Sequence, residues 1–244
     1  MTYKHKHLLL IIVSILIALT LPFYIHIAWY APLIMFVAYF LTKGMGSEIG
    51  AHRLWCHRSF TTNRVWECIL VVLNTLSGEG SIVAFTGIHR LHHAHSDTDK
   101  DPHNPHTHYW ATIFYQHDTS LFGARVIKDL LKDKLLMWQH KNYFNIQAII
   151  VVALALISPL VLWYYAVNVL VTLWTNYLVD VVCHLHGKND NQLDNTSKNN
   201  YWANMFLLGA GLHNNHHARP QEYNNAWGNY RLDIWGNVIK LIKI

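Results

Sequence analysis

The sequence predicts an all-α membrane protein with four transmembrane helices in two hairpins and a helical cytosolic cap. Of the 244 residues, 52% are hydrophobic and only 14% are charged, against about 25% charged residues in an ordinary soluble domain. This composition excludes a disordered chain, which would be rich in charge and poor in apolar residues. Three separated cysteines without a CxxC pair exclude a disulfide scaffold and a cysteine-rich zinc module.

Two long segments without Asp, Glu, Lys or Arg predict the four spans. They cover 36 residues between Lys6 and Lys43 and 38 residues between Lys141 and Asp180. One span needs about 20 apolar residues, so each segment fits two helices better than one. Proline and aromatic residues near the middle of each segment are typical of a turn at the membrane interface. The expected transmembrane helices are residues 8–28, 32–51, 143–158 and 161–183.

Two hairpins return the chain each time to the side from which it started. Every lysine and arginine then lies on one face with both termini, and the positive-inside rule assigns that face to the cytoplasm. The net charge of +5 therefore requires no nucleic-acid partner. The basic start also suits a signal peptide, but the apolar stretch is longer than usual and lacks a small-residue cleavage site.

The remaining residues, 52–142 and 184–244, form the expected cytosolic cap of a single domain covering 1–244. Residues 65–88 within this cap are moderately apolar, but polar residues between Asn74 and Ser81 interrupt them. A fifth span here would separate His52 from His89. We therefore expect an amphipathic or shallow segment on the cytoplasmic face.

Nineteen residues are histidine, as many as lysine and arginine together, and four motifs contain nine of them. HRLHH and HNNHH each place three imidazoles on one helix face, because residues three and four apart lie on the same side. His52 and His57 in HRLWCH are about 140° out of register on an α-helix, so they converge only if the helix ends or bends. Imidazole is the commonest metal ligand, and this number predicts two adjacent metal ions. The candidate ligands are His52, His57, His89, His92, His93, His184, His213, His216 and His217.

The other ten histidines have a more ordinary interpretation. We expect them to lie at the surface or to contact a metal ligand without binding metal themselves. They are His5, His7, His26, His95, His103, His106, His108, His117, His140 and His186.

The four motifs and their flanking residues resemble a known family. HRLWCHRSF, HRLHHAHSDTDKDPHNP, VVCHLHG and DNTSKNNYWANMFLLGAGLHNNHHARP are similar to the histidine boxes of the membrane fatty-acyl desaturases of the stearoyl-CoA and acyl-lipid Δ9 type. The resemblance covers most of the chain in order, spacing and flanking residues. It implies a four-helix membrane stem, a cytosolic cap and a di-iron centre. One iron would be bound by His52, His57, His89, His93 and His216, and the other by His92, His184, His213 and His217.

Three positions depart from the family pattern. The family commonly has asparagine four residues before the fourth-helix histidine, where it holds a metal-bound water, and this chain has Asp180. A carboxylate there could accept that hydrogen bond or ligate a metal directly. Ala210 replaces a glutamate before the third box, and Phe85 replaces a tryptophan before the second. These changes keep the ligand set and bear on the water network, the redox tuning and the reaction.

The resemblance implies a desaturase that introduces a cis double bond, Δ9-like, into a saturated acyl chain of an acyl-CoA or acyl-lipid. Removing hydrogen from an unactivated C–H bond requires a cofactor, here two iron ions that use O2 and two electrons. The sequence has no HPGG, CxxC or flavin motif, so we expect an external donor such as a ferredoxin or cytochrome b5. Arginines of the cap could attract this donor, acyl-CoA phosphates or anionic lipids: Arg53, Arg58, Arg64, Arg90, Arg219 and Arg231.

An acyl chain has no polar handle near its middle, so an apolar tunnel has to position it. Phe36 and Phe40 lie on one helix face before His52, and we expect them to close this tunnel, with Trp55 also among its residues. Ordinary helix packing is the alternative for either phenylalanine. Two other functions stay open: a related membrane di-iron enzyme that hydroxylates an alkyl chain and, more remotely, a histidine-rich metal transporter.

Overall fold

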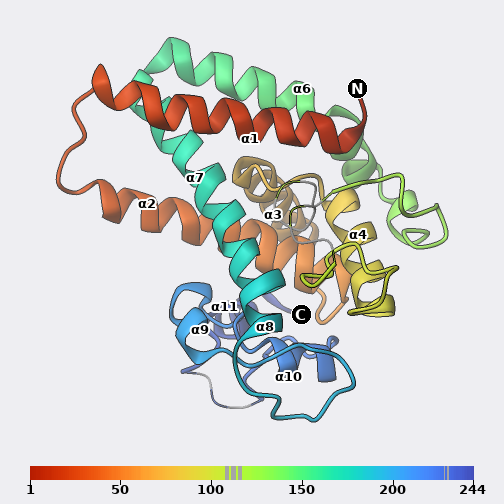
Figure 1. Ribbon diagram of the computed structural model, residues 1–244. Coiled ribbons are helices and arrows are strands. Elements are labelled where there is room, and N and C mark those ends of the chain that lie inside the picture. Colours follow the sequence, from red (N-terminus) through yellow and green to blue (C-terminus); the bar gives the residue numbers. More distant parts are fainter. Residues whose placement is uncertain (108–109, 111–113, 115–116, 228, 230) are drawn as a thin grey trace.

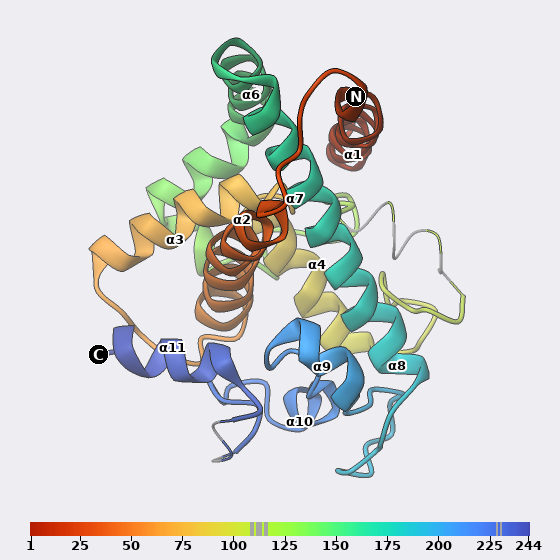
Figure 2. The same ribbon diagram turned by 90° about the vertical axis from the view of Figure 1, so that its left-hand side faces the viewer.

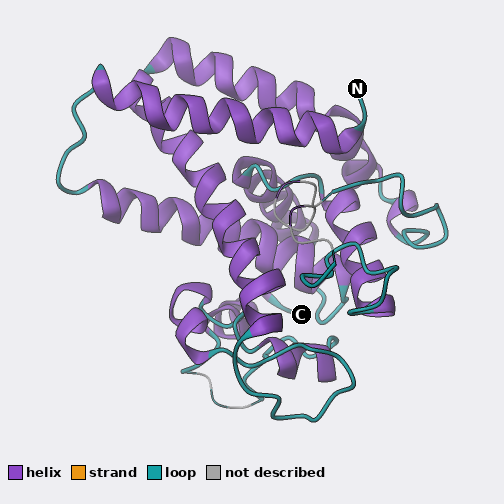
Figure 3. Cartoon of the chain, viewed as in Figure 1, coloured by secondary structure: helices purple, strands orange, loops and turns teal. Residues whose placement is uncertain are grey.

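The computed structural model describes residues 1–244 except 108–109, 111–113, 115–116, 228 and 230. Within these residues the regular structure is helical, and Figure 3 shows no strand among them. Two isolated bridges join Asn199 to Lys188 and to Leu212. The all-α class predicted from the sequence is confirmed for this part of the chain.

The first hairpin consists of α1 (Tyr3–Thr20), η1 (Leu21–Phe23) and α2 (Ala31–Tyr39), which runs directly into η2 (Phe40–Cys56) (Figure 1). The expected span 8–28 therefore starts too late and ends too late. The expected span was placed by hydropathy, which marks the apolar residues and not the ends of the helix. The polar first turn of α1 is helical as well, so the helix begins before the apolar stretch. Trp29, 91% exposed, lies in the connection before α2.

The second hairpin consists of α6 (Lys134–Ile157) and α7 (Pro159–Tyr177), followed by η4 (Leu178–Val182) and α8 (Cys183–Leu185). The expected span 143–158 starts nine residues too late, because the Asp133 side chain accepts hydrogen bonds from the backbone N–H groups of Leu135 and Leu136 and begins the helix there. Ser158 has an extended backbone, and Pro159 occupies the first position of α7, where a missing N–H costs nothing.

Three helical segments of the described chain are long and apolar enough to cross a membrane: Tyr3–Phe23, Lys134–Ile157 and Pro159–Leu185. This finding indicates a membrane protein. The expected span 32–51 is helical throughout in α2 and η2, but it is not one of the three. Its second half carries Lys43 and Glu48, which lower its hydropathy.

The helices α3 (Arg64–Ser77) and α4 (Ile82–His95) cover the segment expected to be shallow or amphipathic. They meet at 83°, and together they have the composition of a broken span or a re-entrant loop. Gly78 ends α3 with a φ of 74°, a conformation that favours glycine. The bend excludes a straight fifth helix, and the rings of His52 and His89 lie 4.7 Å apart between centroids.

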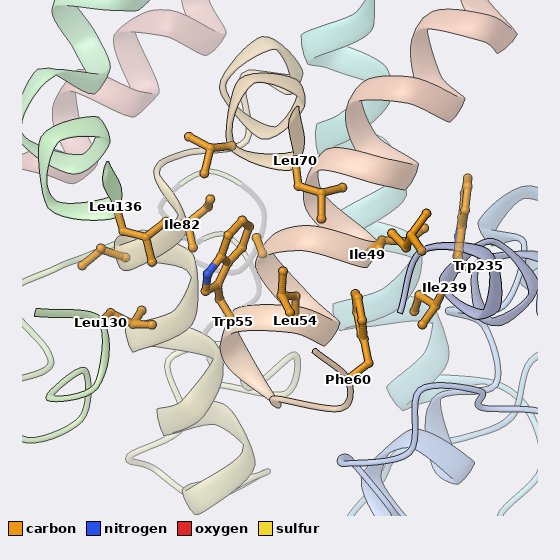
Figure 4. Packing of buried hydrophobic residues seen from close by; sticks show 14 of the residues in the cluster. Ile49, Leu54, Trp55, Phe60, Leu70, Ile82, Leu130, Leu136, Trp235 and Ile239 are labelled. Atoms are coloured by element: carbon orange, nitrogen blue, oxygen red, sulfur yellow. The ribbon is translucent and has the colours of Figure 1, made fainter. Parts of the chain in front are cut away.

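A hydrophobic core lies between η2, α3, α4 and the last helix, α11 (Ile234–Ile242) (Figure 4). Gly46 allows the close contact between η2 and α3, because a Cβ atom there would lie 2.2 Å from the backbone nitrogen of Asn74. Trp235 packs against η2 and donates a hydrogen bond of 2.9 Å from Nε1 to the Leu207 carbonyl. Figure 4 shows Trp55 inside this core beside Leu54 and Ile82.

The expected cap is helical only in part. Besides α3, α4 and α11, its described residues form the short helices η3 (Leu130–Lys132), α9 (Tyr201–Leu207) and α10 (His213–Ala218). Residues 96–107, 117–129 and 186–200 form turns and irregular loops. These loops are rich in Asn, Asp and Pro, which compete with helix formation through side-chain hydrogen bonds or lack the N–H that a helix needs.

Candidate metal centre

A π-helical register brings the first two histidines together. In η2 the backbone bonds to the carbonyl five residues back, and the N–H of His57 donates to the carbonyl of His52 at 3.0 Å. The wider helix places residues five apart on nearly the same face, and the two ring centroids lie 4.8 Å apart. The sequence predicted that the helix must end or bend between these residues. Instead it stays helical in the wider register and ends at Cys56, with His57 directly after it.

The other ligand candidates come from three helical segments. His89, His92 and His93 lie on the last turns of α4, and His213, His216 and His217 lie on α10. His184 lies on α8, directly after the second π-helical segment, η4. π-Helical turns occur frequently at functional sites, and here each of the two precedes candidate ligands.

The nine histidines form two groups. In each group one ligand atom from every member lies within 4.8 Å of the ligand atoms of the others, and most members are buried. This division coincides with the one that the resemblance implies. The first group is His52, His57, His89, His93 and His216, and the second is His92, His184, His213 and His217.

Carboxylates orient at least two of the rings. The Nδ1 atom of His52 lies 3.1 Å from Glu48 Oε1, and Nδ1 of His92 lies 2.9 Å from Asp101 Oδ1. A carboxylate accepts a hydrogen bond from the N–H of the ring nitrogen it faces, so a neutral imidazole must direct its unprotonated Nε2 the other way. These Nε2 atoms lie 3.1 Å from His216 Nε2 and 3.3 Å from His217 Nε2, respectively.

The crowded ring nitrogens fit a bound cation. His57 Nε2 is buried and has no hydrogen-bond partner. A lone pair that faces another lone pair is unfavourable, and a metal ion between them converts both into ligands. The clusters are therefore able to bind metal.

The histidines of α10 are held in the neutral form that binds metal. Burial and then the neighbouring histidines lower the pKa of His213, His216 and His217 well below 6.5. Burial alone would raise the pKa of Asp101, but its hydrogen bond from His92 lowers it overall. At neutral pH the α10 imidazoles are thus neutral, and the Asp101 carboxylate is ionised.

A second carboxylate ties a ligand to the cap loops. Asp97 accepts hydrogen bonds from the backbone N–H of Thr196 at 2.6 Å and from its hydroxyl at 2.8 Å. The same carboxylate lies 3.4 Å from His184 Nδ1, and the Thr196 hydroxyl lies 3.2 Å from that atom. The loop after α4 and the loop before α9 therefore position His184 together.

A small polar cavity adjoins the first group. Its wall includes Lys43, Glu48 and Asn176, beside the rings of His52 and His89. Lys43 Nζ lies 2.7 Å from Glu79 Oε1 and 2.6 Å from Asn176 Oδ1 in a buried position. Neither the buried ion pair nor its place beside the histidines was predicted from the sequence. The only sign of this pair in the sequence was that one lysine, Lys43, interrupts an apolar segment.

Two of the remaining histidines also line this cavity. His103 and His117 are buried, whereas the expectation for them included a surface position. His117 packs edge-on against His7, with ring centroids 5.0 Å apart. His108, one of the same ten, lies outside the described residues.

The three departures from the family pattern lie close to the centre or its support. Asp180 is buried, lines the cavity and has its Oδ2 3.7 Å from His103 Nδ1. It belongs to neither histidine group. Phe85 stacks on the His89 ring at 5.3 Å and 16°. Ala210 packs in a small apolar cluster with Leu207.

The expected tunnel residues lie apart from one another. Phe36 lines an apolar groove on the side of the molecule and is 53% exposed. Phe40 packs against Trp235, with ring centroids 4.9 Å apart. Trp55 lies in the hydrophobic core. None of the three lines the cavity beside His52 and His89.

One arginine expected to attract an electron donor is unavailable to it. Arg53 is 2% exposed and donates to Glu48 at 3.1 Å and to Asp233 at 2.8 Å. Its role in this structure is to join η2 to the start of α11. Arg58, by contrast, has an exposed side chain and shares Asp129 with Arg90.

Comparison with known proteins identifies the class. A family model of the fatty acid desaturases matches residues 27–232. The chain therefore belongs to the fatty acid desaturase family and is an oxidoreductase that acts on fatty acyl chains. This membership confirms the resemblance seen in the histidine motifs and excludes the metal transporter as an alternative.

Individual relatives agree with this class. An sn-1 stearoyl-lipid 9-desaturase of Anabaena variabilis is 29% identical over 223 residues, which cover 89% of this chain and 82% of that protein. A protein of the same description from Synechocystis is 29% identical over 227 residues, covering 89% and 70%. A Δ9 fatty-acid desaturase of Caenorhabditis elegans is 31% identical over 199 residues, covering 75% and 60%.

Proposed function

We propose that this protein introduces a cis double bond, Δ9-like, into a saturated fatty acyl chain carried by a lipid or by coenzyme A. The nine histidines would hold two iron ions, one in each group. O2 and two electrons from an external ferredoxin or cytochrome b5 would complete the reaction. The observation that carries the proposal is the convergence of nine imidazoles in groups of five and four, in a chain of the desaturase family.

The protein's own contribution is positioning. Iron ions held by the histidines would supply the oxidising chemistry that acid–base side chains lack. Glu48 and Asp101 hold the Nδ1 protons of His52 and His92, so that both rings keep their Nε2 atoms toward the centre. Phe85 stacks on one face of the His89 ring and limits its movement. Regioselectivity then depends on which methylene pair the walls place beside the two groups.

We propose that α2 and η2 form the fourth membrane helix, completing two hairpins with α1, α6 and α7. The arrangement would form one domain with both termini and the metal centre on the cytoplasmic side. The contacts between α1 and α7 and between α2 and α7 support a single bundle of these helices. The buried Lys43 and Glu79 pair lets a polar helix occupy such a position, because the two charges satisfy each other.

Expression in a host that lacks the corresponding unsaturated fatty acids tests the reaction. The full chain should produce new double bonds, which mass spectrometry of the lipids detects and locates. His213→Ala should abolish the product, whereas His186→Ala, an exposed histidine of the same cap, should retain it. Saturated lipids from the full chain, with iron bound and a reductant supplied, would refute the proposal.

A related alkyl hydroxylase is the second candidate function. The polar cavity with Asp180 beside the first histidine group favours it, because the family pattern has asparagine at that position. The same lipid analysis distinguishes the two reactions. A hydroxyl group adds the mass of one oxygen atom, whereas a double bond removes two hydrogens.

A further inference from the structure

An apolar groove opens on the side of the molecule between α2, α7 and α9. It has a volume of about 380 Å³ and is lined by nine described residues, none of which is charged. Phe36 and Tyr39 come from α2, Trp174 and Thr175 from α7, and Met205 from α9. α7 crosses α2 in Figure 1, and α9 lies near the C-terminal end of α7 in Figure 2.

The rim of this groove exposes large apolar side chains. Met205 is 72% exposed, Trp202 60%, Phe36 53% and Trp174 43%. The Phe206 ring contacts both tryptophans, with centroids 5.6 Å from Trp174 and 5.4 Å from Trp202. Contiguous exposed apolar side chains indicate an interaction surface. Because α7 belongs to a candidate membrane span, the apolar surroundings that this rim requires are the acyl chains of a bilayer.

The groove and the cavity beside the histidines follow one another along the same two helices. On the first hairpin, Tyr39 lines the groove and Lys43 lines the cavity. On the second, Thr175 lines the groove and Val179 lines the cavity. Each pair is four residues apart, which is about one helical turn. The same two helices therefore form the wall of the groove and, one turn further on, the wall of the space beside the candidate metal ligands.

A single hydrogen bond joins the two sides of the groove at its inner end. The Tyr39 hydroxyl donates to the Phe206 carbonyl at 2.8 Å and ties α2 to α9. Tyr39 itself is 8% exposed, so it lies at the bottom of the groove rather than at its rim. This hydrogen bond thus holds α9 against α2 at the bottom of the groove.

We propose that this groove admits the acyl chain of a membrane glycerolipid sideways from the bilayer and directs it toward the histidine groups. The inference rests on the proposed function and identifies the carrier of the substrate. A lipid whose head group stays at the membrane surface needs only apolar contacts for its chain. An acyl-CoA that entered here would bring several phosphates to a wall without any cation.

Photolabelling of the full chain in phospholipid nanodiscs tests this route. Two probes carry the same diazirine-bearing stearoyl chain, one as an sn-1 glycerolipid and one as stearoyl-CoA, and peptide mass spectrometry locates the labels. A chelator prevents turnover, so labelling is independent of desaturation. The lipid probe should label the segments around Phe36 and Met205 more strongly than the CoA probe does.

Matched variants connect the label to the groove. Met205→Trp fills the opening and should reduce labelling about tenfold, equivalent to about 1.4 kcal/mol of chain binding. Ile149→Trp, at a similarly exposed apolar position on α6, should leave it unchanged. Phe36→Trp provides a second obstruction if Met205→Trp does not fold.

Several results would overturn the proposal. These are equal labelling in the obstructed and control variants, stronger labelling by the CoA probe, labels confined to other surfaces, or a second copy of the chain crosslinked in the groove. Groove labelling without double bonds in the separate lipid assay would leave this route standing and refute the proposed reaction alone.

Discussion

Replacing Asp101 with asparagine should weaken metal binding at the group that contains His92. Asp101 is fully buried, and its two oxygens lie 2.9 and 3.0 Å from His92 Nδ1. The same carboxylate accepts the backbone N–H groups of Asp97 and His103, each at 2.8 Å. An asparagine side chain has one acceptor oxygen and an NH2 group. It therefore leaves at least one of these donors facing another donor.

The expected loss follows from the contacts removed. A hydrogen bond to a charged group is worth about 1.5–3 kcal/mol, and about 1.4 kcal/mol corresponds to a factor of ten in affinity. Loss of one such bond to His92 predicts a decrease of about 10- to 100-fold. This range agrees with that found when groups that orient metal ligands are replaced.

The assay measures the iron retained by the purified full chain through a graded series of chelator concentrations. Asp99→Asn is the matched control, because Asp99 lies on the same loop and is exposed. Thermal unfolding of the metal-free proteins separates a loss of affinity from a loss of fold. If Asp101→Asn retained as much iron as Asp99→Asn across the series, the orienting role of the carboxylate would be refuted.

Three further predictions concern stability. Lys43→Met leaves Glu79 as an unpaired buried charge and should lower the free energy of unfolding by about 3–5 kcal/mol. Adding Glu79→Gln should restore part of the lost stability, and an equal loss in the double variant would contradict a role for the ion pair. Gly46→Ala should destabilise by about 3 kcal/mol or more because the new Cβ meets rigid backbone, whereas Gly123→Ala, with nothing within 4 Å, should melt like wild type. Burial alone would raise the pKa of Asp129, but hydrogen bonds from arginine lower it overall, below its ordinary 3.8. The difference in melting temperature between wild type and Asp129→Asn should therefore be present at neutral pH and disappear as the pH falls below 3.8. A difference that persists in acid would argue against a stabilising ion pair.

The sequence was sufficient to predict long apolar helices in both charge-free segments and the shared helix faces of the histidines, for physical reasons. A charge-free segment of more than 30 residues has few stable arrangements other than two packed helices. The HxxHH spacing fixes a shared helix face because it depends only on helical geometry. The distance between His92 and His217 could be known only from the folded structure, but the family resemblance already implied that they belong to one group.

Other features depended on tertiary contacts that no local pattern contains. The π-helical register of η2 changes which residues share a face, and nothing in the spacing of His52 and His57 distinguishes it from a bend. Lys43 ends the charge-free segment in the sequence, yet its side chain is buried because Glu79 approaches it from the bend between α3 and α4. Phe40 and Trp55 read as tunnel residues, and they pack in the core.

The separation of the ligand-bearing segments along the chain also has a consequence for biosynthesis. His52 and His216 are 164 residues apart, yet their Nε2 atoms lie 3.1 Å from each other. Before α10 leaves the ribosome, the nascent chain offers four members of the first group and only two of the second. Neither candidate ligand group is therefore complete until α10 has been translated. A chain truncated before His213 would retain the three candidate membrane spans but would lack members of both histidine groups.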